Sequence, residues 1–309
     1  MLRIALIGAG RWGKNYIHAV ANSGLGQITS VRTREKRVAQ GTCPQEDSER
    51  RMHGSLDEVL DGVDKIKFDA AIVATHPPNT AAISIELLKR GLPVMAEKPV
   101  SLELNALNEL QTEIERSRLP FLINHQHLFS NGFQAIVSKI GHNRIFSFDS
   151  EAGGDGPHRS YCPIWDYGPH DLAMFFYLNH SKIEDARFES FQEVKGVKQK
   201  IDAKLTNGGS ASFSVWTTGG AKIHSIKITA GVDRIIYRDQ LGKQFITINE
   251  NLIHLPYEPP LDLSVRAFMR AVAANNSQKE FQEYFGLNIS YQYTTFLTNL
   301  LCSQFNIDN

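Results

Sequence analysis

The sequence has few cysteines and no excess of charge of either sign. It contains only three cysteines, Cys43, Cys162 and Cys302, among 309 residues. So small and odd a number does not suggest a disulfide framework, and we expect a reducing, cytoplasmic environment. Lys and Arg together number 33, as do Asp and Glu. This balance argues against a nucleic-acid-binding protein and against a protein that binds membranes through basic residues.

Long apolar runs are also missing. The run Ile4–Ile7 is followed at once by glycines and Arg11, so it is too short for the core of a signal peptide, and no later run is long enough to cross a bilayer. Hydrophobic residues still make up 42% of the chain, which is too many for a disordered protein. Because 309 residues exceed one average core, we expect two domains that share one cleft.

The first third of the chain alternates short apolar runs with helical patterns. Strands are expected at residues 3–7, 28–31, 69–74, 92–96 and 121–124. The clearest helical pattern covers residues 101–118 and places Leu107, Leu110 and Ile114 on one face. Buried strands separated by helices predict a doubly wound parallel sheet that is covered on both faces.

The pattern changes after about residue 125. A strand is expected at residues 144–152 and a short apolar helix at 172–178. Strand candidates then follow from 186 to 254, with turn residues at 207–209, 219–220, 232–233 and 241–242. This spacing is typical of hairpins, and two helices are expected at about 261–275 and 287–305. The sequence therefore predicts an α/β protein with a parallel-sheet domain at residues 1–125. Residues 126–309 are predicted to form an α+β domain with a large, mostly antiparallel open sheet.

A glycine-rich loop follows the first expected strand. Gly8-Ala-Gly10-Arg-Trp-Gly13 is a G-x-G-x-x-G pattern at the start of a helical stretch. In a dinucleotide-binding loop the first glycine permits the tight turn and the second lets the backbone approach the pyrophosphate. The third lets the helix pack against the strand. The pattern predicts a nicotinamide-dinucleotide site that includes Arg11, with Trp12 as a candidate to cover the pyrophosphate or the nicotinamide.

The end of the second expected strand bears on which dinucleotide binds. NAD-binding proteins place an Asp or Glu there to bind the ribose hydroxyl. Here the chain reads Val31-Arg-Thr33-Arg34, which has no carboxylate. Because guanidinium groups match phosphate, Thr33 and Arg34 favour NADP, and NAD stays open.

Two further motifs complete a resemblance. Ala96-Glu97-Lys98-Pro99 follows the fourth expected strand, and Asp166-Tyr-Gly-Pro-His170 has Asp-x-x-x-His spacing. Together with the glycine loop, and over essentially the whole chain, they resemble the Gfo/Idh/MocA oxidoreductase family. The resemblance implies a Rossmann domain that binds NAD or NADP and a second domain that binds substrate. It also implies homo-oligomers, dimers or tetramers, formed through the second-domain sheet.

The resemblance also implies roles for single residues. Lys98 would lie beside the nicotinamide and the reacting oxygen, His170 would be the acid/base group, and Asp166 would position substrate and histidine. Glu97 would contact the nicotinamide ribose, and Thr75 would line the cofactor crevice. Moving a hydride to or from a carbinol carbon also requires moving a proton on the oxygen, and a histidine suits that step at neutral pH.

A narrower resemblance bears on the substrate. Gly10-Arg-Trp-Gly-Lys-Asn15, Gly156-Pro-His-Arg159 and Ile164-Trp-Asp-Tyr-Gly-Pro-His-Asp171 are similar to the nucleotide-sugar 3-dehydrogenase branch, which oxidises UDP-linked N-acetyl sugars or their uronic acids. The substrate expected is therefore a sugar or nucleotide-sugar. Candidate substrate-binding residues are Gln126, His127, Arg159 and Trp165.

Other chemistry is weakly supported. His125-x-His127, and Cys162 near His158, do not supply the spaced ligands of a zinc site, so no metal is expected. Cys162 has no identifiable base and is not expected to be a nucleophile. A cofactor-binding regulator or scaffold without catalysis is the alternative, because fold does not dictate function.

Overall fold

The computed structural model describes residues 1–10, 12–32, 51–53, 67–141, 145–154, 162–220, 222–240, 243–274 and 287–305. The chain divides into two compact units. The first comprises Met1–His125 and Leu261–Tyr291, and the second comprises Gln126–Pro260 and Gln292–Asn309.

The sheet of the first unit is parallel. Its strands are β1 (Leu2–Ile7), β2 (Gly26–Arg32), β3 (Arg51–His53), β4 (Ala70–Val73), β5 (Val94–Glu97) and β6 (Phe121–Asn124). They lie in the order β3-β2-β1-β4-β5-β6, and every pair is parallel. The strand order reverses between β1 and β4, and in doubly wound sheets ligands bind outside the carboxyl ends of the strands at such a point. The predicted parallel sheet is confirmed, with β3 as an additional strand.

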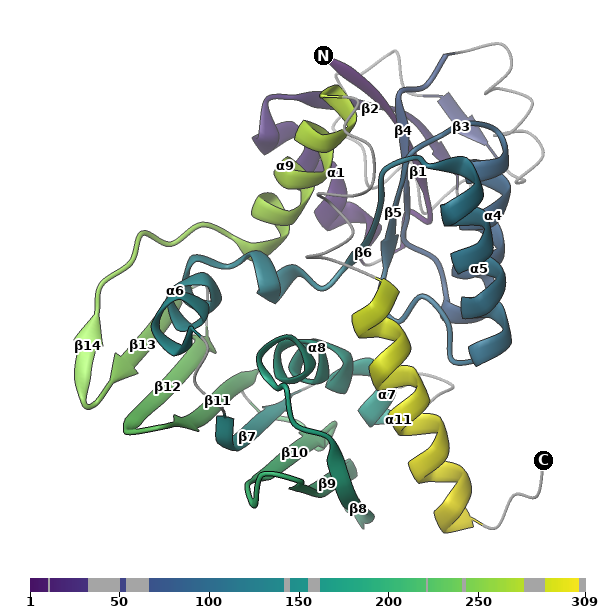
Figure 1. Cartoon of the computed structure of the whole chain (residues 1–309). Helices are drawn as coiled ribbons and strands as arrows, with labels where there is room; N and C mark the ends of the chain where they lie inside the picture. The colour runs from purple at the N-terminus through teal and green to yellow at the C-terminus, as the bar shows by residue number, and fades with distance from the viewer. Residues whose placement is uncertain are drawn as a thin grey trace. The chain divides into compact units, whose positions relative to one another are not determined.

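Helices cover both faces of this sheet. Figure 1 shows α4 (Pro77–Lys89) and α5 (Leu104–Ser117) on one face, and α1 (Gly13–Ser23) and α9 (Pro260–Ala273) on the other. Leu107, Leu110 and Ile114 of α5 are buried, as their spacing predicted. The helix begins later than expected because the Ser101 hydroxyl bonds the backbone N–H and C=O of Glu103 and closes a turn before it.

Helix α9 belongs to the first unit. The Asn22 amide donates to the Asp262 carboxylate over 2.9 Å, and the Ser23 hydroxyl lies 3.3 Å from the Met269 sulfur. The predicted second domain, residues 126–309, includes this helix, whereas Leu261–Tyr291 belongs to the first unit. These side-chain contacts with α1 instead join α9 to the first unit.

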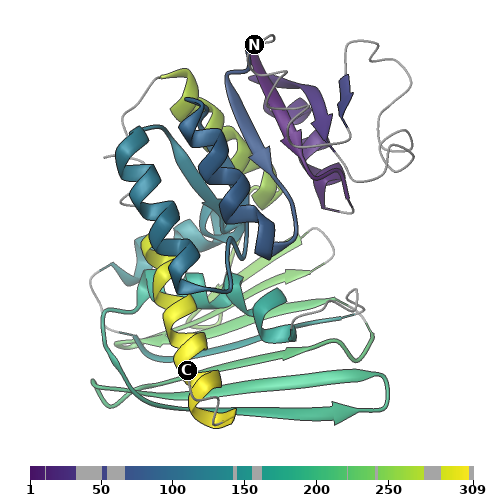
Figure 2. The same ribbon diagram turned by 90° about the vertical axis from the view of Figure 1, so that its right-hand side faces the viewer.

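The second unit contains a large, mostly antiparallel sheet. Its strands are β7 (Ile145–Gly153), β8 (Ile183–Glu193), β9 (Gly196–Leu205), β10 (Ser210–Trp216), β11 (Ile223–Ala230), β12 (Asp233–Gln240), β13 (Lys243–Ile248) and β14 (Asn251–Ile253). Their order is β14-β13-β12-β11-β7-β10-β9-β8, and Figure 2 shows the long strands side by side. All pairs are antiparallel except β7 with β10. The predicted open sheet is confirmed.

One predicted hairpin is wrong. The glycines at 219–220 were expected to join two neighbouring strands, but β10 and β11 lie on opposite sides of β7. The segment between them therefore crosses a strand. The turn at 207–209 does join antiparallel neighbours, β9 and β10.

Short helices of the second unit lie over one face of its sheet. They are η1, a 3₁₀ helix (Gln126–Phe129), α6 (Asn131–Ile140), α7 (Pro163–Asp166) and α8 (Gly168–Leu178), joined by the later part of α11 (Leu287–Phe305). Figure 1 shows α6 and α8 over this sheet. The rings of Phe148, Phe175 and Phe213 pack with centroids 5.4–5.6 Å apart and form the centre of this layer. Among the residues described above, no helix has the length and apolar character that a membrane span requires.

Candidate cofactor and active site

The glycine loop lies at the carboxyl end of β1, beside the end of β4. Gly8 has a φ of 96°, and a Cβ there would lie 2.3 Å from the carbonyl oxygen of Ala74. A Cβ on Gly13 would lie 2.0 Å from the carbonyl oxygen of Gly8. Both positions therefore require glycine, the first for the turn and the second for the close approach of α1 to the strand.

Gly10 differs from its two neighbours in the motif. A Cβ there would meet no atom within 4 Å in the described structure, so internal packing does not require a glycine. Helix α1 begins with no side-chain cap and no acidic residue in its first turn. An open backbone position beside a positively polarised helix end fits the pyrophosphate of a dinucleotide.

Four predicted site residues lie outside the described residues. They are Arg11, Thr33, Arg34 and Arg159. Their predicted contacts with cofactor or substrate stay predictions.

Glu97 is the centre of a buried polar group, which we call the Glu97 cluster: Trp12, Tyr16, Glu97 and Asn124. The Tyr16 hydroxyl donates to Glu97 Oε1 over 2.6 Å and the Asn124 amide donates to the same oxygen over 3.1 Å. The Trp12 indole N–H also donates to it. Asn124 further donates to the Tyr16 oxygen over 2.6 Å. These bonds join α1 to the ends of β5 and β6 and fix the backbone that leads to Lys98.

Burial dominates the electrostatics of this cluster. Glu97 is 6% exposed, and burial raises its pKa, although the positive charge of Lys98 and the three donors oppose the shift. Burial, followed by the charge of Glu97, also raises the pKa of Tyr16 well above its usual value. Trp12 was expected to cover the cofactor, and in the structure its N–H is directed at Glu97. Its contact with the cofactor stays a prediction.

Lys98 lies at the carboxyl end of β5, where a doubly wound sheet binds its ligand. The buried imidazole of His125 follows β6, the next strand of the sheet, and its Nε2 lies 2.8 Å from the Ser290 hydroxyl. Burial and the positive charge of Lys98 lower the pKa of His125 to about 3, so this histidine is neutral at physiological pH. Thr75 follows β4, and its hydroxyl lies 2.9 Å from that of Thr80. Glycine loop, Thr75, Lys98 and His125 thus share one edge of the sheet.

Asp166 and His170 lie in the second unit. Tyr167, between α7 and α8, has right-handed helical angles of −89° and −41°. Asp166 thus ends α7 and His170 lies in the first turn of α8, with this single residue between the two helices.

His170 is part of a larger group, which we call the histidine cluster: His127, His170, Asp171, His224 and Asp239. The His127 ring lies edge-on to His170, with centroids 4.8 Å apart, and 4.5 Å from the His224 ring. His127 Nδ1 lies 3.6 Å from Asp239 Oδ2. Buried His224 Nε2 lies 2.6 Å from Asp171 Oδ1. Burial lowers the pKa of His224, but the charge and hydrogen bond of Asp171 outweigh it, so the pKa is raised overall.

The remaining predicted residues have less specific surroundings. Gln126 opens η1 and is partly exposed. Trp165 is 7% exposed, and its ring packs edge-on against Tyr293, with centroids 6.5 Å apart. Packing within the unit accounts for its position, and its substrate contact stays a prediction. Burial raises the pKa of the Cys162 thiol, which agrees with the expectation that it is no nucleophile.

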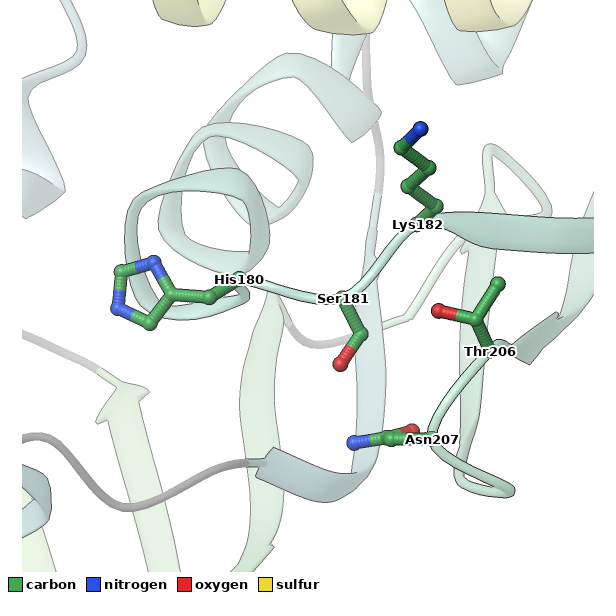
Figure 3. A pocket seen from close by; sticks show the side chains of 5 residues that line it. All are labelled: His180, Ser181, Lys182, Thr206 and Asn207. Atoms are coloured by element: carbon green, nitrogen blue, oxygen red, sulfur yellow. The ribbon is translucent and has the colours of Figure 1, made fainter.

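A hollow elsewhere in the second unit lacks comparable chemistry. It lies where the loop after α8 meets the β9–β10 turn (Figure 3). Its lining includes one lysine, no carboxylate and none of the predicted site residues: His180, Ser181, Lys182, Thr206 and Asn207. We do not assign it to the site.

Sequence reasoning missed several residues of the two clusters. Tyr16 and Asn124 join Glu97 only through the fold. His224 and Asp239 lie on strands far along the chain from His127. Asp171 was part of a quoted motif and could have been noted as a carboxylate next to His170.

Comparison with known proteins gives a family match for the first part of the chain and structural matches for nearly all of it. Residues 2–125 match the Gfo/Idh/MocA family model, described as oxidoreductase family, NAD-binding Rossmann fold. Over 192 residues the chain is 29% identical to the myo-inositol dehydrogenase Hyg17 of Streptomyces leeuwenhoekii. That match covers 59% of this chain and 57% of the length of Hyg17.

Solved structures share the fold over nearly the whole chain. UDP-N-acetylglucosamine 3-dehydrogenase GnnA of Acidithiobacillus ferrooxidans superposes with a TM-score of 0.81 at 17% identity, covering 97% of this chain and 96% of that one. Myo-inositol 2-dehydrogenase of Lactobacillus plantarum gives 0.79 at 13% identity, covering 98% and 96%. At these identities the likeness concerns the fold.

The parallel sheet of the first unit and its glycine loop are those of a dinucleotide-binding Rossmann domain. Residues 2–125, less than half of the chain, match the NAD-binding Rossmann fold of the Gfo/Idh/MocA oxidoreductase family.

Proposed function

We propose that this protein is an NAD(P)-dependent oxidoreductase that transfers hydride between the nicotinamide and a carbinol or ketone carbon of a sugar or nucleotide-sugar. The observation that carries the proposal is the glycine loop. Of its three glycines, only Gly10 could carry a Cβ without approaching another atom within 4 Å. The oxidoreductase family of residues 2–125 supports it. The end of α7 and the first turn of α8, which carry Asp166 and His170, are joined by a single residue, and this supports a joint role for the two side chains.

The chain's own residues have separate tasks in this proposal. The backbone at Gly8–Gly13 and the start of α1 hold the pyrophosphate, and Glu97 and Lys98 lie beside the nicotinamide ribose and ring. The bound cofactor supplies hydride exchange at its nicotinamide. The Lys98 ammonium stabilises negative charge on the reacting oxygen. His170 gives or takes the proton on that oxygen, and Asp166 orients its ring or the substrate.

NADP is the dinucleotide that we propose. Support comes from Thr33 and Arg34 at the end of the second strand, where NAD-binding proteins carry a carboxylate. Affinities for NADPH and NADH should be measured by nicotinamide fluorescence before and after Arg34→Ala. We expect the variant to lose affinity for NADPH by about tenfold or more, because a guanidinium–phosphate contact is lost, and to keep its affinity for NADH. Unchanged affinity for both would argue against NADP.

The substrate class rests on two kinds of support. Hyg17 is named a myo-inositol dehydrogenase and GnnA a UDP-N-acetylglucosamine 3-dehydrogenase, and both names describe oxidation of a ring hydroxyl. The motifs around Arg159 and Trp165 favour a nucleotide-sugar. A screen should follow NADP⁺ and NAD⁺ reduction with UDP-N-acetylglucosamine, its uronic acid and myo-inositol, and NADPH oxidation with keto-sugars.

Two variants test the mechanism. Lys98→Ala and His170→Ala should each lower kcat by about 10²-fold or more and leave the cofactor dissociation constant within about threefold. Lys89→Ala and His254→Gln, at exposed positions, serve as matched controls and should keep full activity. Equal activity in all four variants would remove the proposed mechanism.

The alternative is a cofactor-binding regulator or scaffold without catalysis. It predicts tight dinucleotide binding and no turnover with any member of the screen. The presence of Lys98, Asp166 and His170 together favours the enzyme.

We also propose a homo-oligomer, dimer or tetramer, which light scattering of the purified protein tests.

A further inference from the structure

Two strands and one 3₁₀ helix of the second unit bring together three side chains of types that commonly bind metal ions. The β11–β12 register pairs Ser225 with Arg238 and Ile226 with Tyr237. His224 and Asp239, each one residue from the end of its strand, therefore lie on the face that carries Ile226 and Tyr237, because side chains alternate along a strand. His127 of η1 lies against both. The three residues each offer one ligand atom, and these atoms lie within 4.8 Å of one another.

A second observation concerns His224. Its Nε2 is hydrogen-bonded to Asp171 over 2.6 Å. Nδ1 is therefore the ring nitrogen that could bind a metal ion. That nitrogen is buried and makes no hydrogen bond to any residue that the structure describes, while the whole residue is only 6% exposed. Metal-binding histidines characteristically use their other ring nitrogen to bond a carboxylate, which orients the ring. Asp171 has that relation to His224.

We propose that His127, His224 and Asp239 bind a divalent transition-metal ion such as zinc. Two imidazole nitrogens and one carboxylate form a donor set that zinc and its neighbours in the first transition row accept, whereas magnesium and calcium prefer oxygen ligands alone. Three protein ligands leave a fourth position for water or for an oxygen of a bound molecule. The carboxylates of Asp171 and Asp239 balance the charge of a divalent ion.

The site requires a modest contraction to bind the ion. Ligand atoms around tetrahedral zinc lie about 3.4 Å apart, from bond lengths near 2.1 Å. His127 Nδ1 and Asp239 Oδ2 are 3.6 Å apart, close to that value. The largest separation, up to 4.8 Å, must shorten. The side chains of His127 and Asp239 are 13% and 15% exposed, less tightly enclosed than His224, so their rotation can close the site around a fixed His224.

The test is metal binding by the full chain, with any affinity tag removed and bound metal stripped by a chelator. Zn²⁺ is titrated by calorimetry, and Co²⁺ by visible absorption, which reports four-coordinate geometry. We expect one ion per chain. His127→Gln and Asp239→Asn should weaken binding by about 100-fold or more, because each removes a ligand. Asp171→Asn should weaken it by about 10–100-fold through the orientation of His224.

Matched controls separate this site from adventitious binding. His254→Gln and Asp185→Asn change the same residue types at exposed positions and should keep wild-type affinity and stoichiometry. Because His127 and Asp239 are only partly buried, their variants should fold even if a His224 variant does not, and circular dichroism in chelator checks this. Binding that persists unchanged in His127→Gln and Asp239→Asn, or the absence of saturable Zn²⁺ and Co²⁺ binding by the wild-type chain, would overturn the proposal.

The metal proposal is independent of the redox proposal. The ligand residues and Asp171 all belong to the second unit, and the titration contains no dinucleotide. A chain that binds one ion and shows no hydride transfer would refute only the redox proposal. A chain that turns over substrate and binds no ion would refute only the metal site.

Discussion

Glu97 in the first unit and Asp171 in the second are both buried carboxylates, yet they are stabilised by different partners. Glu97 accepts hydrogen bonds from three neutral side chains, Trp12, Tyr16 and Asn124. Asp171 is bonded to the His224 imidazole, 2.6 Å away. Both residues are at most 6% exposed, so burial alone does not distinguish them.

The two carboxylates differ in whose pKa is shifted: that of the carboxylate itself or that of its partner. The positive charge of Lys98 and the three neutral donors do not fully offset the desolvation of Glu97, and its own pKa is raised. At Asp171 the negative charge acts on its partner, and the pKa of His224 is raised against the effect of burial. The first arrangement joins α1 to the carboxyl ends of β5 and β6, beside the proposed cofactor site. The second fixes the ring of a histidine within a group of titratable side chains.

The largest effect is expected from breaking the support of the Glu97 cluster. Gly13→Ala would put a Cβ 2.0 Å from a backbone oxygen, so α1 must shift and take Trp12 and Tyr16 away from Glu97. We expect a loss of about 3 kcal/mol in the free energy of unfolding, measured by urea denaturation. Gly10→Ala is the matched control: it meets open space and should change stability by less than about 0.5 kcal/mol. Equal losses in the two variants would show that the loop packs differently.

A smaller effect separates the two carboxylates directly. Double-mutant cycles with Asp171→Asn and His224→Gln, and with Glu97→Gln and Tyr16→Phe, give the two coupling free energies. We expect about 2 kcal/mol for the first pair, because both partners can be charged, and about 1 kcal/mol for the second. Denaturation should be followed in chelator so that bound metal does not contribute. Equal coupling free energies would contradict the claim that the two carboxylates are stabilised in different ways.

The smallest effect concerns pH. Because the pKa of Glu97 is raised in the folded state, the folded chain binds more protons than the unfolded chain above the usual value of 4.5. The stability that this group contributes is therefore complete at low pH and is lost as pH rises through its folded pKa, by about 1.4 kcal/mol per unit of pKa difference. Unfolding of wild type and Glu97→Gln should be compared from pH 4 to 8. The wild type should lose stability relative to the variant as pH rises, whereas exposed Glu109→Gln should show no such trend. A constant difference would contradict the raised pKa.

Much of the first unit could be predicted because its signals are local. The run Arg3–Ile7 followed by Gly8 and Gly13 already contains a strand, a turn and a helix start. The spacing of Leu107, Leu110 and Ile114 identifies the buried face of α5. Short β3 has no such signal, since it consists of Arg51–His53 and contains no apolar run.

Most of the site's surroundings could not be predicted, because they depend on contacts between distant segments. Tyr16 meets Glu97 only when α1 packs beside β5, and His224 meets Asp171 only when β11 lies under α8. The turn at 219–220 misled the prediction of a hairpin, since glycines mark a change of direction and not which strand comes next. His125 and His127 are two residues apart in the sequence, yet they belong to different units of the fold.

The most direct measurement is a crystal structure of the chain with NADPH and a substrate analogue. The redox proposal predicts that the Lys98 ammonium and the His170 imidazole both face the nicotinamide C4, on the side where the analogue's oxygen lies, with Asp166 beside the histidine. A structure that showed Lys98 and His170 on separate surfaces, with no shared cavity at the nicotinamide, would contradict it.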